Sequence, residues 1–160
     1  MLPTRDDVAR LAGVSSATVS YVINNGPRPV AEQTRLRVLH AIEQLGYQPS
    51  EVARSLKTKT TASIGLIISN IELTFFTRIA RSVQDAADAM GSTVILANSD
   101  ERPQREADYV RLMSSKRVDG LILAPTGQNI DLLRSVQAHG IPIVTIDRPA
   151  PGLAAPFVGI

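Results

Sequence analysis

The chain has 160 residues, of which 44% are hydrophobic, and it carries no cysteine and a formal net charge of +2. A chain of this length suits one medium domain, or a small domain joined to part of a larger one. The lack of cysteine excludes disulfides, thiolate metal ligands and a thiol nucleophile. No apolar run approaches the length of a membrane span, and the first residues do not resemble a secretory signal. We therefore expect a cytoplasmic protein that does not enter the membrane.

The positive charge is concentrated in the first part of the chain. Residues 1–60 contain eight Lys and Arg against five Asp and Glu, whereas residues 61–160 contain nine against ten. A local excess of positive charge is a mild indication of binding to phosphate groups. A difference of this size also arises by chance, so composition alone leaves the partner open.

Residues 4–24 predict two short helices joined by a tight turn. Thr4 can cap the first helix, and Gly13 suits the left-handed position that ends it. The three- and four-residue spacing predicts an apolar face on this helix made of Val8, Leu11 and Ala12. Ser15 or Ser16 then caps the second helix.

The second of these helices has one apolar side and one side of small or hydrogen-bonding residues. The apolar side holds Val19, Val22 and Ile23, and the other side holds Ser16, Ala17, Thr18, Ser20 and Tyr21. A helix-turn-helix that reads DNA has this layout, because its second helix presents N-terminal side chains to base edges in the major groove. A helical hairpin in another kind of domain has the same spacing, so this pattern alone does not decide between the two.

The next part of the chain completes a small helical unit. After a loop at residues 25–30, residues 31–45 predict a third helix with an apolar stripe that includes Val38, Ile42 and Leu45. Residues 49–57 predict a short helix, which needs a packing partner because nucleation is costly in water. Residues 58–63 have the composition of a polar linker.

From Ser63 onward, short apolar strands alternate with amphipathic helices. Strands are predicted at 63–69, 93–99, 119–125 and 142–148, with a fifth beginning at 157–160, and helices at 75–91, 103–118 and 129–140. Alternation with short links predicts right-handed βαβ units and a doubly wound parallel sheet. The fifth strand has no natural finish, so we expect either a truncated form of a longer protein, which we favour, or a sheet completed by another chain.

Four separated segments resemble the LacI family (LacI/GalR) of bacterial transcriptional regulators. These segments are DVARLAGVSSATVSYVIN at 7–24, AIEQLGYQPSEVARSLKT at 41–58, SIGLIISNIELTFF at 63–76 and KRVDGLILAP at 116–125. The resemblance implies a helix-turn-helix headpiece at 1–48, a hinge helix and linker at 49–62, and at 63–160 part of an effector-binding and dimerisation domain. That part corresponds to the first, incomplete subdomain of a fold like that of periplasmic binding proteins.

The function that the resemblance implies is sequence-specific regulation of transcription, as a repressor. The expected partners are double-stranded operator DNA with a palindromic sequence, a second copy of the chain in a homodimer, and a small effector such as a sugar in the full-length form. No cofactor and no metal site is expected.

The resemblance also assigns candidate DNA contacts. It implies base contacts by Ser16, Ala17 and Tyr21, and a minor-groove wedge at the operator centre by Leu56. It implies phosphate contacts by Thr4, Ser15, Thr18, Ser20, Asn24, Arg28, Tyr47, Arg54 and Lys57. Tyr21 departs from a frequent family pattern, since an Arg at this place can bind guanine bidentately and a tyrosine cannot.

The candidate effector cleft lies at the carboxyl ends of the strands. The resemblance implies that it is lined by Asn70, Phe75, Phe76, Thr126 and Asp147. We expect at least one of the two Phe residues to lie in the core instead. The opposing subdomain is absent from these 160 residues, so weak or no effector response is expected.

Two other functions compete with DNA binding. An enzyme is disfavoured, because the chain lacks a Gly-x-Gly-x-x-Gly turn, a P-loop and a nucleophile elbow, and His40 and His139 lie in separate predicted modules. A periplasmic-type sugar-binding protein, or another small-ligand module without DNA binding, remains the alternative. Salt-dependent binding to duplex DNA separates these readings.

Overall fold

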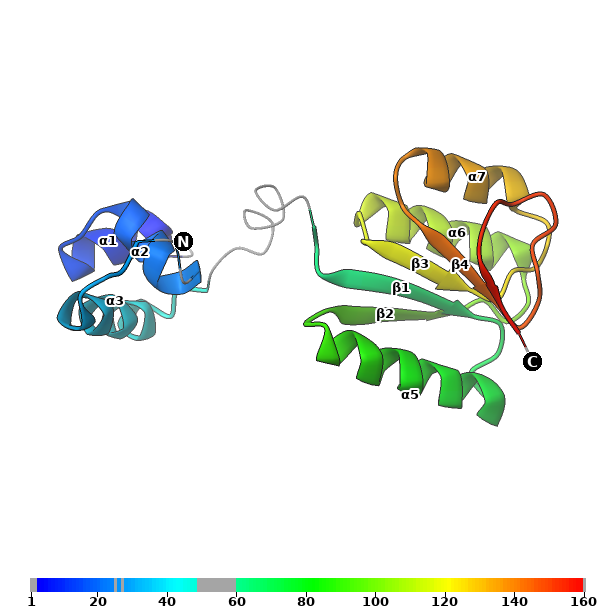
Figure 1. Cartoon of the computed structure of the whole chain (residues 1–160), viewed down its shortest axis with the longest axis horizontal. Coiled ribbons are helices and arrows are strands. Elements are labelled where there is room, and N and C mark those ends of the chain that lie inside the picture. The colour runs from blue at the N-terminus through cyan, green and yellow to red at the C-terminus, as the bar shows by residue number, and fades with distance from the viewer. Residues whose placement is uncertain (1–2, 25, 27, 49–59, 160) are drawn as a thin grey trace. The chain divides into compact units, whose positions relative to one another are not determined.

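The computed structural model describes residues 3–24, 26, 28–48 and 60–159. The chain divides into two compact units, Met1–Arg54 and Ser55–Ile160 (Figure 1). Each unit has its own hydrophobic core. The predicted hinge helix at 49–57 lies outside the described residues. Among the described residues, no helix is both long enough and apolar enough to span a bilayer.

The first unit consists of three helices, α1 (Arg5–Ala12), α2 (Ser16–Asn24) and α3 (Glu32–Leu45). Its core is formed by Val8, Ala9, Ala12, Val19, Val22, Val38 and Ala41. The prediction that Leu11 belongs to this core is wrong, because Leu11 is 48% exposed. At about 100° per residue, Leu11 lies on the side of Val8 away from Ala12, and Ala9 takes the inward position.

Both caps predicted for α1 are present. Thr4 and Asp7 form a reciprocal capping box, and Gly13 ends the helix in the left-handed conformation at φ 64°. For α2, the cap is Ser15 and not Ser16, since the backbone N–H of Thr18 donates to Ser15 Oγ at 3.2 Å. These local signals fix where α1 ends and α2 begins, and so the angle at which α2 is presented.

The second unit is a five-stranded parallel sheet with helices on both faces (Figure 1). In chain order it contains β1 (Ser63–Ile68), α5 (Thr74–Ala89), β2 (Thr93–Asn98), α6 (Pro103–Ser115), β3 (Gly120–Leu123), α7 (Ile130–Ala138), β4 (Ile143–Ile146) and β5 (Phe157–Val158). The strand order is β2-β1-β3-β4-β5, and every neighbouring pair is parallel. The prediction of an incomplete, doubly wound parallel sheet is confirmed.

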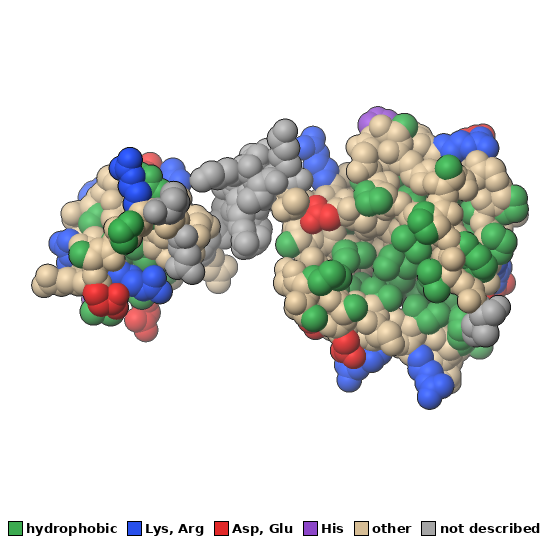
Figure 2. All heavy atoms as spheres, in the orientation of Figure 1, with side chains coloured by type: hydrophobic (Ala, Val, Ile, Leu, Met, Phe, Trp, Pro, Cys, Tyr) green, Lys and Arg blue, Asp and Glu red, His purple; other side chains and the backbone are tan. Residues whose placement is uncertain are grey.

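The two faces of this sheet are covered unequally. On one face, α6 and α7 pack on a large core that includes Ile67, Met113, Leu121 and Leu133. On the other face α5 packs on β1 and β2, and hydrophobic side chains are gathered over the strands of this unit in Figure 2. Along one register row, Leu66 is fully buried, Ile122 and Val144 are half-buried, and Leu96 is 43% exposed.

Candidate nucleic-acid interface and ligand-binding edge

Helix α2 presents one polar face to its surroundings. Val19 and Val22 turn inward and are buried, whereas Ala17 is exposed and Ser16, Thr18, Ser20 and Tyr21 are half-buried. No Lys or Arg occurs in Ser16–Asn24. Three of the predicted base contacts, Ser16, Ala17 and Tyr21, therefore lie together on one accessible helix face that carries no charge.

The hydroxyl groups along α2 hold internal hydrogen bonds. Ser15 Oγ and Thr18 Oγ1 lie 2.9 Å apart and share one hydrogen bond. The Asn24 side chain donates to the backbone oxygen of Ser20 at 3.0 Å and to Ser20 Oγ at 3.2 Å. These bonds fix the positions of four predicted phosphate contacts before any ligand arrives.

Thr4, another predicted phosphate contact, is used as a helix cap. Its N–H and its hydroxyl both donate to Asp7 Oδ2, at 2.9 Å and 2.6 Å, while its hydroxyl accepts from the N–H of Asp7. The hydrogen bonds from Thr4, with a smaller effect of the Arg10 charge, lower the pKa of Asp7 below its ordinary value. For Thr4 to donate to a phosphate, it would have to give up a hydrogen bond to Asp7 and form one to the phosphate instead.

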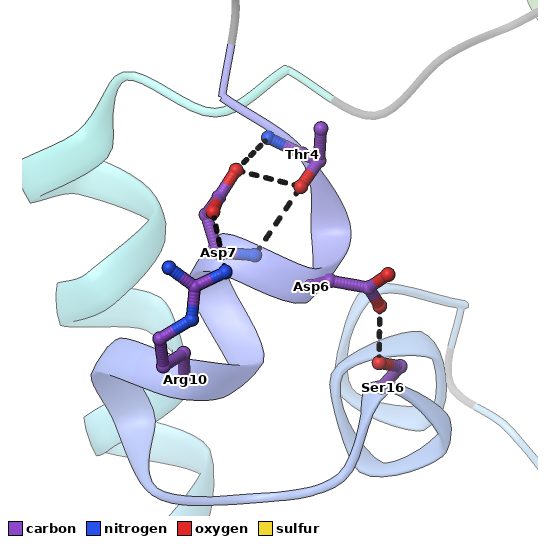
Figure 3. A network of polar contacts seen from close by, with 5 residues as sticks. All are labelled: Thr4, Asp6, Asp7, Arg10 and Ser16. Atoms are coloured by element: carbon purple, nitrogen blue, oxygen red, sulfur yellow. Dashed lines mark hydrogen bonds and ion pairs between the residues drawn. The ribbon is translucent and has the colours of Figure 1, made fainter.

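Asp6 contacts the start of α2 from the neighbouring helix (Figure 3). Ser16 Oγ donates to Asp6 Oδ1 at 2.5 Å, across ten positions of the sequence. The two adjacent aspartates thus serve different helices, because Asp7 caps α1 whereas Asp6 reaches α2. This pair is not evident from the sequence, because its members lie on two different helices and no short-range period relates their positions.

Tyr21 lies against the chain that follows α2. The backbone N–H of Gly26 donates to the backbone oxygen of Tyr21 at 3.0 Å. A Cβ at position 26 would collide with Cδ1 of the Tyr21 ring and lie 3.2 Å from the Tyr21 Cα. Only glycine fits under this ring, so the loop composition that signalled a turn also positions a predicted base contact.

The remaining predicted DNA contacts are placed as follows. Arg28 is exposed in the loop before α3. Tyr47 is half-buried against the core of the first unit, and its N–H donates to the backbone oxygen of Ile42 at 3.0 Å. The other three predicted contacts, Arg54, Leu56 and Lys57, lie outside the described residues.

The predicted ligand-binding residues follow the carboxyl ends of the strands. Asn70 follows β1, and its side-chain oxygen accepts from the N–H of Glu72 at 2.8 Å. Phe76 is 3% exposed and belongs to the core under α5, as expected for at least one of the Phe pair. Phe75 is half-buried and meets Phe76 edge to face, with ring centroids 5.0 Å apart. Phe75 is therefore the more accessible member of the pair.

Thr126 is held by a buried carboxylate whose burial is not evident from the sequence pattern. Glu106 of α6 is fully buried, and its Oε2 accepts from the backbone N–H of Thr126 at 2.6 Å. Its Oε1 accepts from Thr126 Oγ1 at 3.0 Å and from the side-chain nitrogen of Asn129 at 2.8 Å. Asn129 also donates to the backbone oxygen of Pro103 at 2.8 Å. The loop after β3 is thus tied to the first turn of α6.

Asp147 lies at a strained point after β4. It has φ 66°, a conformation that residues other than glycine rarely adopt. Arg148 bridges Asp147 and Glu101, at 3.2 Å and 3.1 Å. Partial burial lowers the pKa of Arg148, but the hydrogen bonds to the two carboxylates outweigh it and raise the pKa. Asp100 and Glu101, after β2, also have positive φ, so strained backbone gathers at the carboxyl edge, where such strain often marks function.

The two units together show which class of protein this is. The first unit has three helices and presents the polar face of its second helix. The second unit is a parallel α/β sheet that carries polar and aromatic groups at its carboxyl edge. The pairing is that of a helix-turn-helix module with a ligand-binding-type domain.

The family follows from comparison with known proteins. Residues 4–50 match the bacterial regulatory proteins of the lacI family, and residues 61–156 match the periplasmic binding proteins and sugar binding domain of the LacI family. The chain belongs to the LacI family.

Individual relatives agree with this assignment. The chain is 42% identical over 147 residues to the HTH-type transcriptional repressor PurR of Vibrio cholerae, over 91% of this chain and 44% of that protein. It is 40% identical over 148 residues to the sucrose operon repressor of Pediococcus pentosaceus, over 92% and 44%. The lac repressor dimer bound to operator and the anti-inducer ONPF matches with a TM-score of 0.77 and 28% identity, over 91% and 44%. The chain spans less than half the length of these relatives.

Proposed function

We propose that this chain is the DNA-reading part, with a portion of the regulatory domain, of a transcriptional repressor that binds a palindromic operator as a homodimer. The observation that carries the proposal is the accessible polar face of α2, held on a capped three-helix core. The names of the relatives support it, since they include two repressors and a lac repressor dimer bound to operator. The proposal places the protein in the bacterial cytoplasm and gives it no enzymatic activity.

In this proposal, α2 lies in the major groove. Ser16, Ala17 and Tyr21 face base edges, because they occupy the N-terminal and outward positions of the helix. The surrounding hydroxyl and amide groups contact phosphates and set the register without reading sequence. Two copies of the headpiece bind the two halves of the palindrome, since the symmetry of the operator mirrors that of the protein dimer.

The experiment is selection of binding sites from random duplex DNA with the 160-residue chain, followed by titration of the selected site at several salt concentrations. The expected result is an enriched palindrome, with affinity for the selected site that exceeds affinity for bulk DNA and falls as salt rises. Enrichment of no palindrome at moderate ionic strength would refute the proposal.

Leu56 provides a second test at the centre of the operator. Leu56→Ala should lose specific affinity by about 2–4 kcal/mol, because an apolar wedge stabilises a kinked base step. Leu36→Ala is the matched control, since Leu36 is 57% exposed on α3 and has no proposed contact with DNA. Equal operator affinity of Leu56→Ala and wild type would remove the wedge from the proposal.

The carboxyl edge of the sheet is proposed as one half of an effector site, lined by Asn70, Phe75, Thr126 and Asp147. The 160 residues span less than half the length of the relatives they match, and we expect their own response to effector to be weak or absent. Calorimetric titration with sugars and nucleobases tests this statement, and tight binding by the 160-residue chain would overturn it.

A further inference from the structure

The Asp6–Ser16 hydrogen bond has a consequence for DNA reading. The Ser16 hydroxyl at the start of α2 donates to a carboxylate oxygen of Asp6 on α1. An ionised carboxylate only accepts, so the hydroxyl proton of Ser16 must lie on the Asp6 side of the bond. The neighbouring carboxylate does not compete for this proton, because Asp7 is engaged with Thr4 and Arg10 (Figure 3).

A serine hydroxyl has one proton and two lone pairs. Once the proton is directed at Asp6, Ser16 can only accept a hydrogen bond from a ligand. In the major groove, the amino groups of adenine and cytosine donate, whereas the N7 and O6 atoms of guanine and the O4 atom of thymine accept. A serine held in this way pairs with an amino base and meets a keto base without a hydrogen bond.

We propose that Asp6 determines operator specificity through Ser16, by fixing the serine hydroxyl as an acceptor that selects adenine or cytosine over guanine or thymine on the contacted strand. Asp6 is a positioning residue, since it acts through Ser16 and not on the base. The proposal rests on the proposed function, because it requires the N-terminus of α2 to lie against base edges.

The charge of Asp6 has a separate effect. Asp6 is exposed beside the proposed DNA-facing helix, and α2 carries no Lys or Arg to offset it. A carboxylate at this place repels phosphates of every sequence equally, so it weakens binding without discriminating between bases. The orientation of the Ser16 hydroxyl therefore affects base preference, whereas the charge of Asp6 affects affinity for all sequences. Substitutions at Asp6 can separate the two effects.

The test uses site selection and affinity titration with four forms of the 160-residue chain: wild type, Asp6→Ala, Ser16→Ala and the double variant. The base pair that Ser16 faces is identified as the one whose preference disappears in Ser16→Ala. At that pair, wild type should prefer amino over keto bases by about 3- to 10-fold, the effect of one hydrogen bond. Asp6→Ala should lose this preference, because the freed hydroxyl can donate or accept.

The double variant and Asp6→Asn complete the experiment. In the Ser16→Ala background, Asp6→Ala should leave base preferences unchanged. Asp6→Asn keeps an acceptor oxygen beside Ser16 and removes the charge, so it should retain the amino preference while affinity for all sequences rises. Three results would overturn the proposal. The first is that Asp6→Ala keeps the preference for amino bases, and the second is that Asp6→Ala still changes base preference in the Ser16→Ala background. The third is that Asp6→Asn loses the preference for amino bases as Asp6→Ala does. Failure of wild type to select any palindrome would instead count against the proposed function.

Discussion

The buried carboxylate of Glu106 offers the sharpest test of how the second unit is held together. Glu106→Gln keeps the volume of the side chain and replaces one acceptor oxygen with an amide NH2. If the NH2 faces the backbone N–H of Thr126, two donors meet where a 2.6 Å hydrogen bond stood. If it faces the other way, it meets the amide nitrogen of Asn129 instead. Either orientation breaks at least one of the hydrogen bonds that the fully buried carboxylate accepts from the half-buried Thr126 and Asn129.

The magnitude follows from these losses. A buried donor left without a partner costs about 1–3 kcal/mol, and bonds to a charged group are stronger than neutral ones. The lost hydrogen bond and the weakening of the remaining ones together predict that Glu106→Gln lowers the free energy of unfolding of the second unit by about 2–4 kcal/mol. For a unit of this size, the thermal midpoint should fall on the order of 10 to 30 °C.

The assay is urea denaturation of the whole chain followed by circular dichroism. Hydrogen-exchange mass spectrometry assigns the shifted transition to peptides of α6 and the loop after β3. Asp108→Asn is the matched control, because Asp108 lies on the same helix, is 60% exposed, and contacts Gln104 and Arg111 at the surface. It should change stability by no more than about 0.5 kcal/mol. Equal stability of Glu106→Gln and Asp108→Asn would refute the reasoning.

Two further substitutions, each with a control, test other parts of the fold. Thr4→Ala should destabilise the first unit by about 1 kcal/mol through loss of the cap, whereas Thr4→Ser should not, as measured by urea denaturation. Because the folded-state pKa of Asp7 is lowered, its contribution is present above the ordinary value of 3.8 and is lost as pH falls through the lowered pKa. The stability gap between wild type and Thr4→Ala should therefore narrow at low pH, and a constant gap would contradict this. Gly65→Ala puts a Cβ 2.9 Å from a β3 side chain and should lower the free energy of unfolding of the second unit by about 1–3 kcal/mol, as measured by thermal unfolding. Gly120→Ala is the control, because the nearest atom to its Cβ is 3.8 Å away and little loss is expected. Equal midpoints for the two glycine variants would refute that contrast.

The architecture was predictable because it depends on short-range patterns. Short apolar runs placed all five strands, and helical stripes placed the helices between them. The exposed side of α2 followed from the same reasoning. The error at Leu11 shows the limit of counting three- and four-residue spacings, since a small Ala9 turned out to face the core in place of the larger Leu11.

The contacts that position the candidate sites were not predictable, because they join distant parts of the chain. Glu106 reads as a surface residue in a polar helical turn, yet it is fully buried beneath the loop that follows β3. Its burial is understood only once α6 is packed on the sheet. In the same way, the Gly26 contact that positions Tyr21 depends on the path of a loop whose composition signals a turn and nothing more.

The chemistry of α2 constrains how the proposed regulator achieves affinity. A helix without Lys or Arg releases few counterions, so α2 itself contributes little of the salt-dependent, sequence-independent attraction to DNA. Of the basic residues in 1–48, Arg5, Arg10, Arg28, Arg35 and Arg37, none lies on α2. In the proposed complex, positive charge therefore acts from outside α2, and the predicted phosphate contacts Arg28, Arg54 and Lys57 are candidates for this role. The hydroxyls of Ser15, Ser16 and Ser20 are already held by Thr18, Asp6 and Asn24. Of these hydroxyls, only that of Ser16 is proposed to face a base, and one hydrogen bond contributes little affinity. The proposed repressor would therefore need to engage two half-sites together for this discrimination to be expressed as tight binding.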